Sequence, residues 1–87
     1  MFVIVTYDVD EKRVNKVRKH LKKYLIWVQN SVFEGEITAG KLCKCLSEIN
    51  KITIKETDSI YVYTVENPRH ISKEVLGITK NIEDIFL

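Results

Sequence analysis

The chain has 87 residues, enough for one small domain but too few for two domains that each bury a core. With 45% hydrophobic residues, 30% charged residues and one proline, its composition is typical of a globular fold and excludes a disordered tail or a fibrous protein. No apolar run approaches the roughly 20 residues that span a membrane, and no signal peptide is visible. We therefore expect a cytoplasmic protein with no membrane partner.

The net charge of +2 hides an uneven distribution of charge. Half of the 14 basic residues fall in one segment without an acid: Lys12, Arg13, Lys16, Arg18, Lys19, Lys22 and Lys23. The rest of the chain has 7 bases against 12 acids, a net charge of −5. The protein is thus an acidic chain with one strongly basic segment.

The first predicted elements are a strand and a helix. Residues 2–7 are β-branched or aromatic and predict a strand that is apolar on both faces, and so central in its sheet. Asp10 is the expected N-cap of the following helix. The apolar stripe of that helix has helical spacing and comprises Val14, Val17, Leu21, Tyr24 and Leu25. Most of the basic side chains then fall on the opposite, outer face of the helix.

A hairpin, a second helix and another strand follow. Residues 26–29 predict a short strand, Asn30-Ser31 a reversal, and residues 32–37 a returning strand in which Gly35 marks a bulge. Thr38 is the expected N-cap of the second helix. Within that helix Cys43 and Cys45 point in different directions around the axis, so we expect neither a disulfide between them nor a zinc site. Residues 60–65 predict the fourth strand, whereas residues 52–55 fit a strand or a loop. The element order β-α-β-β-α-β is that of the α+β ferredoxin-like fold.

A sheet of this kind carries helices on one face only. Since the first and fourth strands are apolar on both faces, we expect a second copy of the chain to cover the open face, which makes the protein a homodimer. Residues 1–66 would form the ferredoxin-like domain and residues 67–87 a tail on the partner. In that tail, residues 73–78 predict a fifth strand added to the partner's sheet, followed by the apolar residues Ile82, Ile85, Phe86 and Leu87.

Tyr7-Asp8 is the sharpest candidate site, because it places a carboxylate at the end of a buried strand. Mg²⁺ is usually held by one or two carboxylates together with water and phosphate oxygens, and a two-fold dimer would bring two copies of Asp8 together. The alternative is that Asp8 or Asp10 only caps the first helix.

The basic outer face of the first helix is the second candidate. Lysines spaced along a helix can contact a phosphate backbone, whereas most charged faces are simply solvated. The contacts expected for this face come from Lys12, Lys16, Lys19 and Lys23. Near the reversal, Gln29, Asn30 and Ser31 can bind phosphate or the turn backbone, and Phe33 can stack on a base or pack in the core.

These residues together resemble the Cas-two family of CRISPR-associated proteins. The resemblance rests on Tyr7-Asp8-Val9, on Lys12-Arg13 and Lys16-Val17, and on the run from Val28 to Gly35 (VQNSVFEG), and it covers residues 1–65 in order and spacing. It implies a ferredoxin-like homodimer that acts in spacer acquisition, bridging two dimers of the Cas-one integrase and holding duplex DNA on basic surfaces.

The family is also described as metal-dependent endonucleases that act on RNA or double-stranded DNA. The resemblance implies that Asp8 is the Mg²⁺ ligand, that Tyr7 is catalytic, that Arg13 and Ser31 contact nucleic acid, and that Gln29 and Phe33 are further motif positions. One departure is Trp27, where the family often has Arg. Two alternatives remain on the same fold: a stand-alone ribonuclease of the toxin type and a small-molecule sensor.

Overall fold

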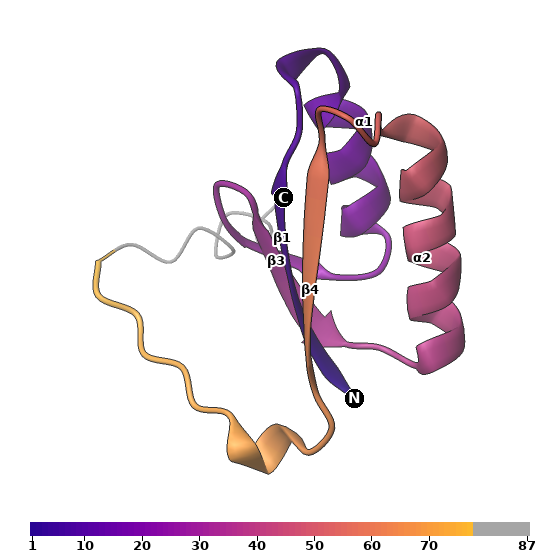
Figure 1. Ribbon diagram of the computed structural model, residues 1–87. Helices are drawn as coiled ribbons and strands as arrows, with labels where there is room; N and C mark the ends of the chain where they lie inside the picture. Colours follow the sequence, from indigo (N-terminus) through magenta and orange to yellow (C-terminus); the bar gives the residue numbers. More distant parts are fainter. Residues whose placement is uncertain (78–87) are drawn as a thin grey trace.

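The computed structural model describes residues 1–77, which form one four-stranded antiparallel sheet with two helices on one face (Figure 1). The strands are β1 (Phe2–Asp8), β2 (Ile26–Gln29), β3 (Val32–Glu36) and β4 (Ser59–Val65). The helices are α1 (Glu11–Lys22), α2 (Ala39–Ile52) and the short 3-10 helix η1 (Pro68–His70). The strand order is β2-β3-β1-β4, so β1 is central as predicted. The order β-α-β-β-α-β with this sheet confirms the ferredoxin-like α+β fold.

The alternation of side chains along β1 divides the molecule into two layers. Val3, Val5 and Tyr7 point toward the helices and are buried, whereas the residues between them lie on the other face of the sheet. We call the covered side the helix face and the other side, which on β1 carries Phe2, Ile4, Thr6 and Asp8, the open face. The core between sheet and helices contains Val3, Val5, Tyr7, Val17, Leu21, Leu25, Phe33, Ile37, Cys45 and Ile49.

Both helices begin at the predicted caps. The Asp10 carboxylate accepts a hydrogen bond from the Lys12 amide at 2.9 Å, and the Thr38 hydroxyl accepts one from the Lys41 amide at 3.2 Å. Of the two cysteines, which are both free, Cys43 is exposed and Cys45 is buried. Burial raises the pKa of the Cys45 thiol to about 11, which makes it an inert core residue.

Two details of the hairpin differ from the expectation. The irregularity in the hairpin lies on β2, between Trp27 and Gln29, and not at Gly35, which pairs regularly with Val3. A glycine is favoured there because a Cβ would stand 3.3 Å from the Leu25 side chain. The second difference is that β3 ends one residue earlier than predicted. Of the two alternatives left open for residues 52–55, the structure shows the loop: they are the end of α2 and a turn.

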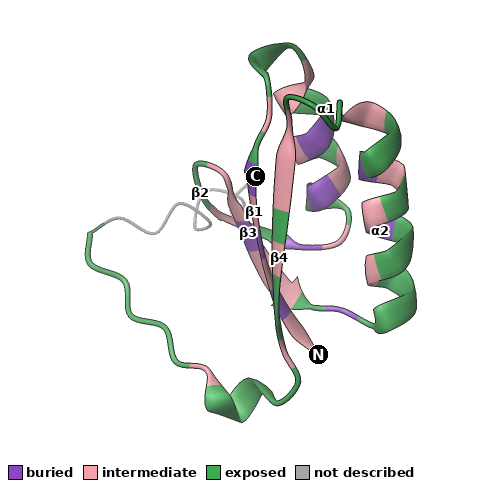
Figure 2. Cartoon of the chain, in the orientation of Figure 1, coloured by how far each residue is buried: buried purple, intermediate pink, exposed green. Residues whose placement is uncertain are grey.

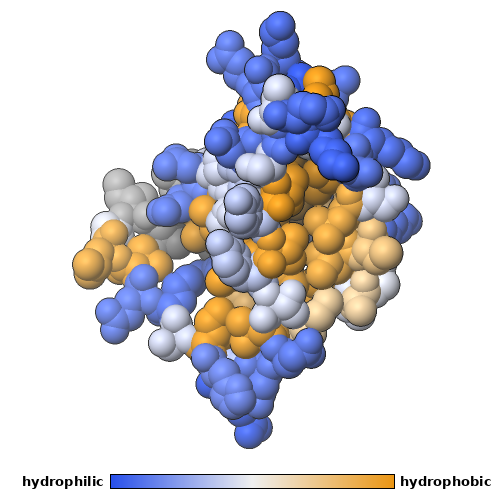
Figure 3. All heavy atoms as spheres, viewed as in Figure 1, coloured by the Kyte–Doolittle hydropathy of each residue, from blue (hydrophilic) through white to orange (hydrophobic). Residues whose placement is uncertain are grey.

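The open face carries large apolar side chains that the described residues leave uncovered. Tyr61 and Tyr63 on β4 are 59% and 55% exposed, and Ile26 on β2 is 54% exposed. Figure 2 shows that the residues on the inner side of the helices are buried, whereas much of β4 and the segment after it are not. Figure 3 shows a second apolar area, between β4 and α2 at the side where sheet and helix meet, with hydrophilic surface at both ends of the molecule.

The segment after β4 leaves the sheet. Beyond η1, residues 71–77 form no strand, although Lys73 makes an ion pair with Glu34 of β3. The predicted fifth strand needs a second chain as its partner, so it stays a prediction, as does the division of the chain at residue 66. The apolar residues predicted to pack at the end of the tail lie outside the described residues. Within residues 1–77, no helix has the length and apolar character needed to cross a membrane.

Candidate functional site

Asp8 is the last residue of β1, on the open face, opposite Ser59 of β4. Its side chain is exposed and makes no hydrogen bond or ion pair with any other residue in 1–77. The cap of α1 is Asp10, so of the two carboxylates offered as caps only Asp10 serves as one. Among the described residues, Asp8 is therefore a carboxylate without a hydrogen-bond or ion-pair partner, held at the end of a central strand.

Tyr7, the other predicted member of the site, points to the helix face and is only 5% exposed. Consecutive residues of a strand point to opposite faces, so the side chains of Tyr7 and Asp8 are not brought together. The Tyr7 hydroxyl donates to the Asn30 carbonyl at 3.3 Å and accepts a hydrogen bond from Arg18 Nε at 3.2 Å. Tyr7 thus joins the β2–β3 turn to α1.

The β2–β3 turn lies at the same end of the sheet as Asp8, because the Tyr7 amide donates to the Ser31 carbonyl at 3.1 Å. Asn30 takes a left-handed conformation with φ 33°, and its carbonyl also accepts a hydrogen bond from Trp27 Nε1 at 3.0 Å. Ser31 is half-buried. The structure therefore brings the turn, Tyr7 and the end of β1 to one edge of the molecule.

Two further motif residues differ sharply in exposure. Gln29 is exposed at the end of β2, next to the turn, where its side chain is accessible. Phe33 is fully buried, and its ring centroid lies 6.1 Å from that of Tyr7. Of the two interpretations of Phe33, the structure supports the core residue, because a buried ring offers no face to a base.

Arg13 is bound to Asp58, which lies directly before β4 and is not among the predicted site residues. Arg13 Nε and Nη2 donate to the two carboxylate oxygens of Asp58 at 2.7 and 3.0 Å. The amides of Asp10 and Ile54 donate to the same carboxylate at 3.0 and 2.8 Å. The hydrogen bond from Arg13, followed by that from the Ile54 amide, holds the pKa of Asp58 well below its usual range.

Asp58 thus ties the start of α1 to the α2–β4 loop, next to the end of β1, with only 1% of its side chain exposed. Two nitrogens of Arg13 are engaged there, so the predicted nucleic-acid contact would be left to Nη1. No local signal predicts this ion pair, because its two residues are 45 positions apart. A sequence signal that could have been used is the position of an Asp directly before a strand, at the sheet end where the first helix begins.

The predicted basic surface on the outer side of α1 is present and exposed. Its four predicted lysines are Lys12, Lys16, Lys19 and Lys23. None of them makes an ion pair within residues 1–77. From the first to the last of these lysines the helix rises about 16 Å. The surface therefore presents a row of unneutralised positive charge.

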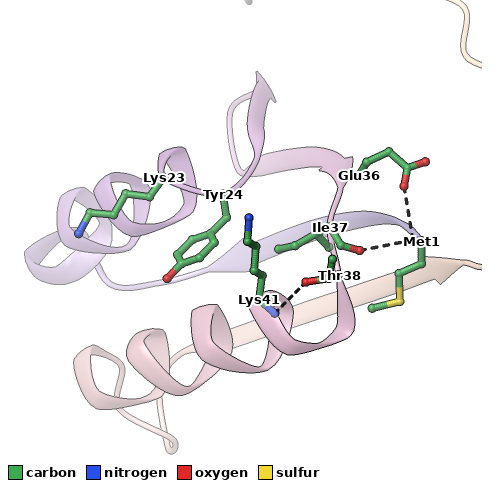
Figure 4. A pocket seen from close by; sticks show the side chains of 7 residues that line it. All are labelled: Met1, Lys23, Tyr24, Glu36, Ile37, Thr38 and Lys41. Carbon is green, nitrogen blue, oxygen red and sulfur yellow. Dashed lines mark hydrogen bonds and ion pairs between the residues drawn. The ribbon is translucent and has the colours of Figure 1, made fainter.

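Lys23, the last lysine of this row, stands apart from Asp8. It borders a hollow of about 390 Å³ at the far end of the sheet, between α1 and the start of α2, together with Lys41 and the Thr38 cap (Figure 4). The N-terminal amine lies there too, 3.4 Å from Glu36. In the turn after α1, the hydroxyl of Tyr24 donates a hydrogen bond to Glu48 of α2 at 2.7 Å, which links this turn to α2 and raises the pKa of Tyr24 to about 12.

The site fits Mg²⁺ only if a second chain contributes. Within residues 1–77 no three His, Cys, Asp or Glu side chains come together as metal ligands. One chain contributes a single carboxylate, that of Asp8, which has no competing hydrogen bond within residues 1–77. A second Asp8, water and phosphate oxygens would complete the oxygen ligand set that Mg²⁺ prefers.

Comparison with known proteins gives one consistent family. Residues 1–70 match the family model described as CRISPR associated protein Cas2. A protein of Thermodesulfovibrio yellowstonii named CRISPR-associated endoribonuclease Cas2 3 is 63% identical over 81 residues, 93% of this chain and 92% of that protein. A Thermotoga maritima protein named CRISPR-associated endoribonuclease Cas2 is 44% identical and covers 100% of this chain and 99% of its own length.

The solved structures agree. A crystal structure titled as that of cas2 has a TM-score of 0.81 and 44% identity, with 92% of this chain and 90% of that chain covered. Streptococcus pyogenes Cas2 at pH 6.5 has a TM-score of 0.75 and 35% identity, with 88% and 100% covered. The family match, the relatives and the shared fold confirm the resemblance drawn from the Tyr7-Asp8 strand end and the VQNSVFEG run. The chain belongs to the CRISPR-associated Cas2 family.

Proposed function

We propose that this protein is an endonuclease that works as a homodimer, in which Asp8 of each chain holds one Mg²⁺ at a phosphodiester bond. The observation that carries the proposal is an exposed, unpartnered carboxylate at the end of the central strand, on the same face as uncovered apolar side chains. A second copy that covers Tyr61 and Tyr63 would shield the apolar surface and supply the second carboxylate. The names of the relatives favour RNA as the substrate.

The residues around Asp8 have supporting tasks in this reaction. When bound, Mg²⁺ polarises a phosphate and lowers the pKa of an attacking water. The pairing of β1 with β4, in which Asp8 lies opposite Ser59, would hold the Asp8 carboxylate in place. Asp58 keeps the start of α1 attached next to this strand end, and Tyr7 keeps the β2–β3 turn attached to it.

The direct test is cleavage by the purified full-length protein. RNA and duplex DNA of the same sequence are incubated with Mg²⁺, with Ca²⁺ and with EDTA, and products are resolved by length. We expect internal cleavage that requires Mg²⁺ and proceeds in the dimer fraction of a sizing column. Cleavage that persists in EDTA, or that occurs only in a monomer fraction, would contradict the proposal.

A second candidate function is to hold the duplex of an incoming spacer precursor in the CRISPR adaptation complex with the Cas-one integrase. The basic surface of α1 favours it, because its lysines make no ion pair within residues 1–77 and can bind a phosphate backbone independently of sequence. Co-expression with the integrase from the same locus separates the candidates. An adaptation subunit should co-purify with the integrase, whereas a stand-alone toxin-type ribonuclease should inhibit growth without it.

Reversal of charge on α1 should weaken duplex binding and its dependence on salt. For the triple variant Lys12→Glu, Lys16→Glu and Lys19→Glu, we expect the slope of log affinity against log salt to fall by about 3, since each phosphate contact contributes about 0.9. The measurement is a titration of labelled duplex at several salt concentrations.

The matched control reverses three exposed lysines elsewhere, Lys44, Lys51 and Lys55, which changes the net charge equally. An equal loss of slope in both variants would show that only the overall charge matters, and would contradict binding along α1.

A further inference from the structure

Arg18 is the second arginine of α1, and it is held in place by the core. Its Nε donates to the Tyr7 hydroxyl at 3.2 Å, and Tyr7 is itself buried and bonded to the Asn30 carbonyl. Arg18 is half-buried, in contrast to the exposed lysines beside it. The guanidinium is therefore fixed close to the β2–β3 turn, whereas the lysines of the outer surface end in free ammonium groups.

The Nη nitrogens of Arg18 have no hydrogen-bond or ion-pair partner within residues 1–77. Arg13 differs in this respect, because its Nε and Nη2 are both bound to the buried carboxylate of Asp58. An arginine fork that is oriented at Nε and open at its Nη nitrogens is suited to binding an oxyanion.

The surroundings of Arg18 are strongly positive. It borders a hollow of about 400 Å³ whose other lining residues are Asn15, Lys16, Lys19 and Lys22. The lining contains four cations and no carboxylate. At the end of the hollow formed by Lys22, the Nζ atom of that lysine lies 5.8 Å from the centre of the Trp27 ring of β2. All five lining residues belong to α1, so the hollow runs along one side of this helix.

We propose that Arg18 binds a backbone phosphate of nucleic acid in this hollow, and that Tyr7 is its positioning residue. The proposal rests on the proposed nucleic-acid function and says where the nucleic acid binds. Its backbone crosses α1 at Arg18, which Tyr7 holds near the β2–β3 turn. It also assigns to Tyr7 a task other than catalysis, since the Tyr7 hydroxyl lies on the helix face, away from Asp8. Within α1, the phosphate-binding arginine is then Arg18 and not Arg13.

The test is the salt dependence of binding to labelled RNA and duplex DNA by the full-length protein. Arg18→Gln should lose about tenfold in affinity at low salt and reduce the salt slope by about 1, as expected for one phosphate contact. Arg18→Lys keeps the positive charge but not the planar guanidinium. It should therefore keep the salt slope of the wild-type protein and lose about threefold in affinity. The control Lys44→Gln removes a charge from the exposed side of α2 and should leave both quantities near wild type.

Tyr7→Phe tests positioning separately from stability. The ring stays in the core, but Arg18 loses its acceptor, so affinity should fall by about threefold in a protein that still unfolds cooperatively. In an Arg18→Gln background, Tyr7→Phe should have no further effect on affinity, because its effect passes through Arg18.

Two results would overturn the inference while the proposed function stands: a wild-type salt slope in Arg18→Gln, or additive losses in the double variant. Absence of binding by the wild-type protein would contradict the proposed function itself, and this inference with it.

Discussion

Asp8→Asn is expected to slow Mg²⁺-dependent cleavage by at least about a hundredfold, since a catalytic metal supplies several kcal/mol of stabilisation. The amide has nearly the shape of the carboxylate but no charge, so the metal would lose its protein ligand in both chains. The Asp8 side chain makes no hydrogen bond or ion pair within residues 1–77, and the melting temperature should therefore stay within about 2 °C of wild type. The measurement is the initial cleavage rate over a range of Mg²⁺ concentrations.

The matched control is Asp10→Asn, two residues along the chain. Asparagine caps a helix as well as aspartate does, so this variant should fold normally and cleave at close to the wild-type rate. Equal rates for Asp8→Asn and the wild-type protein would exclude Asp8 as the metal ligand. A slow Asp8→Asn variant that still supports spacer acquisition in cells would separate the nuclease from the adaptation function.

The elements could be predicted because their signals are local. The run of β-branched residues in β1, the apolar stripe of α1, and the caps Asp10 and Thr38 each lie within a few residues of the element they define. The same local information distinguishes Asp8 from Tyr7, since adjacent residues of a strand face opposite sides. Strand alternation alone is therefore enough to assign the two side chains to different faces of the sheet.

The contacts that hold the site together could not be predicted in this way. Arg13 and Asp58 meet only because the sheet places the start of β4 beside the start of α1, and Arg18 and Tyr7 meet across the core between helix and strand. A row of bases along a helix does not reveal which of them is already bound within the fold. Charge counting therefore does not distinguish Arg13 from Arg18, although within residues 1–77 Arg13 Nη2 is bound to Asp58 and both Nη nitrogens of Arg18 are open.

Asp58→Asn is expected to lower the melting temperature at neutral pH by about 5 °C or more. Each carboxylate oxygen of Asp58 accepts hydrogen bonds from Arg13 and from one backbone amide, Asp10 or Ile54. An asparagine would turn an NH₂ group toward two of these donors, leaving them unpaired in a place that is nearly closed to water. The measurement is thermal unfolding at a series of pH values from 7 to 2.

The effect of Asp58→Asn on the melting temperature should depend on pH. Because the folded state holds the pKa of Asp58 below its unfolded value of about 3.9, the stabilisation by its carboxylate is complete above that pH and is lost as the pH falls below it. The gap in melting temperature between wild type and Asp58→Asn should therefore be constant from pH 7 to about pH 5 and shrink below about pH 4. Glu56→Gln, an exposed neighbour in the same turn, should follow the wild-type curve. A gap that stays constant down to pH 2 would mean that the side-chain shape at this position, and not its charge, holds α1 to the start of β4.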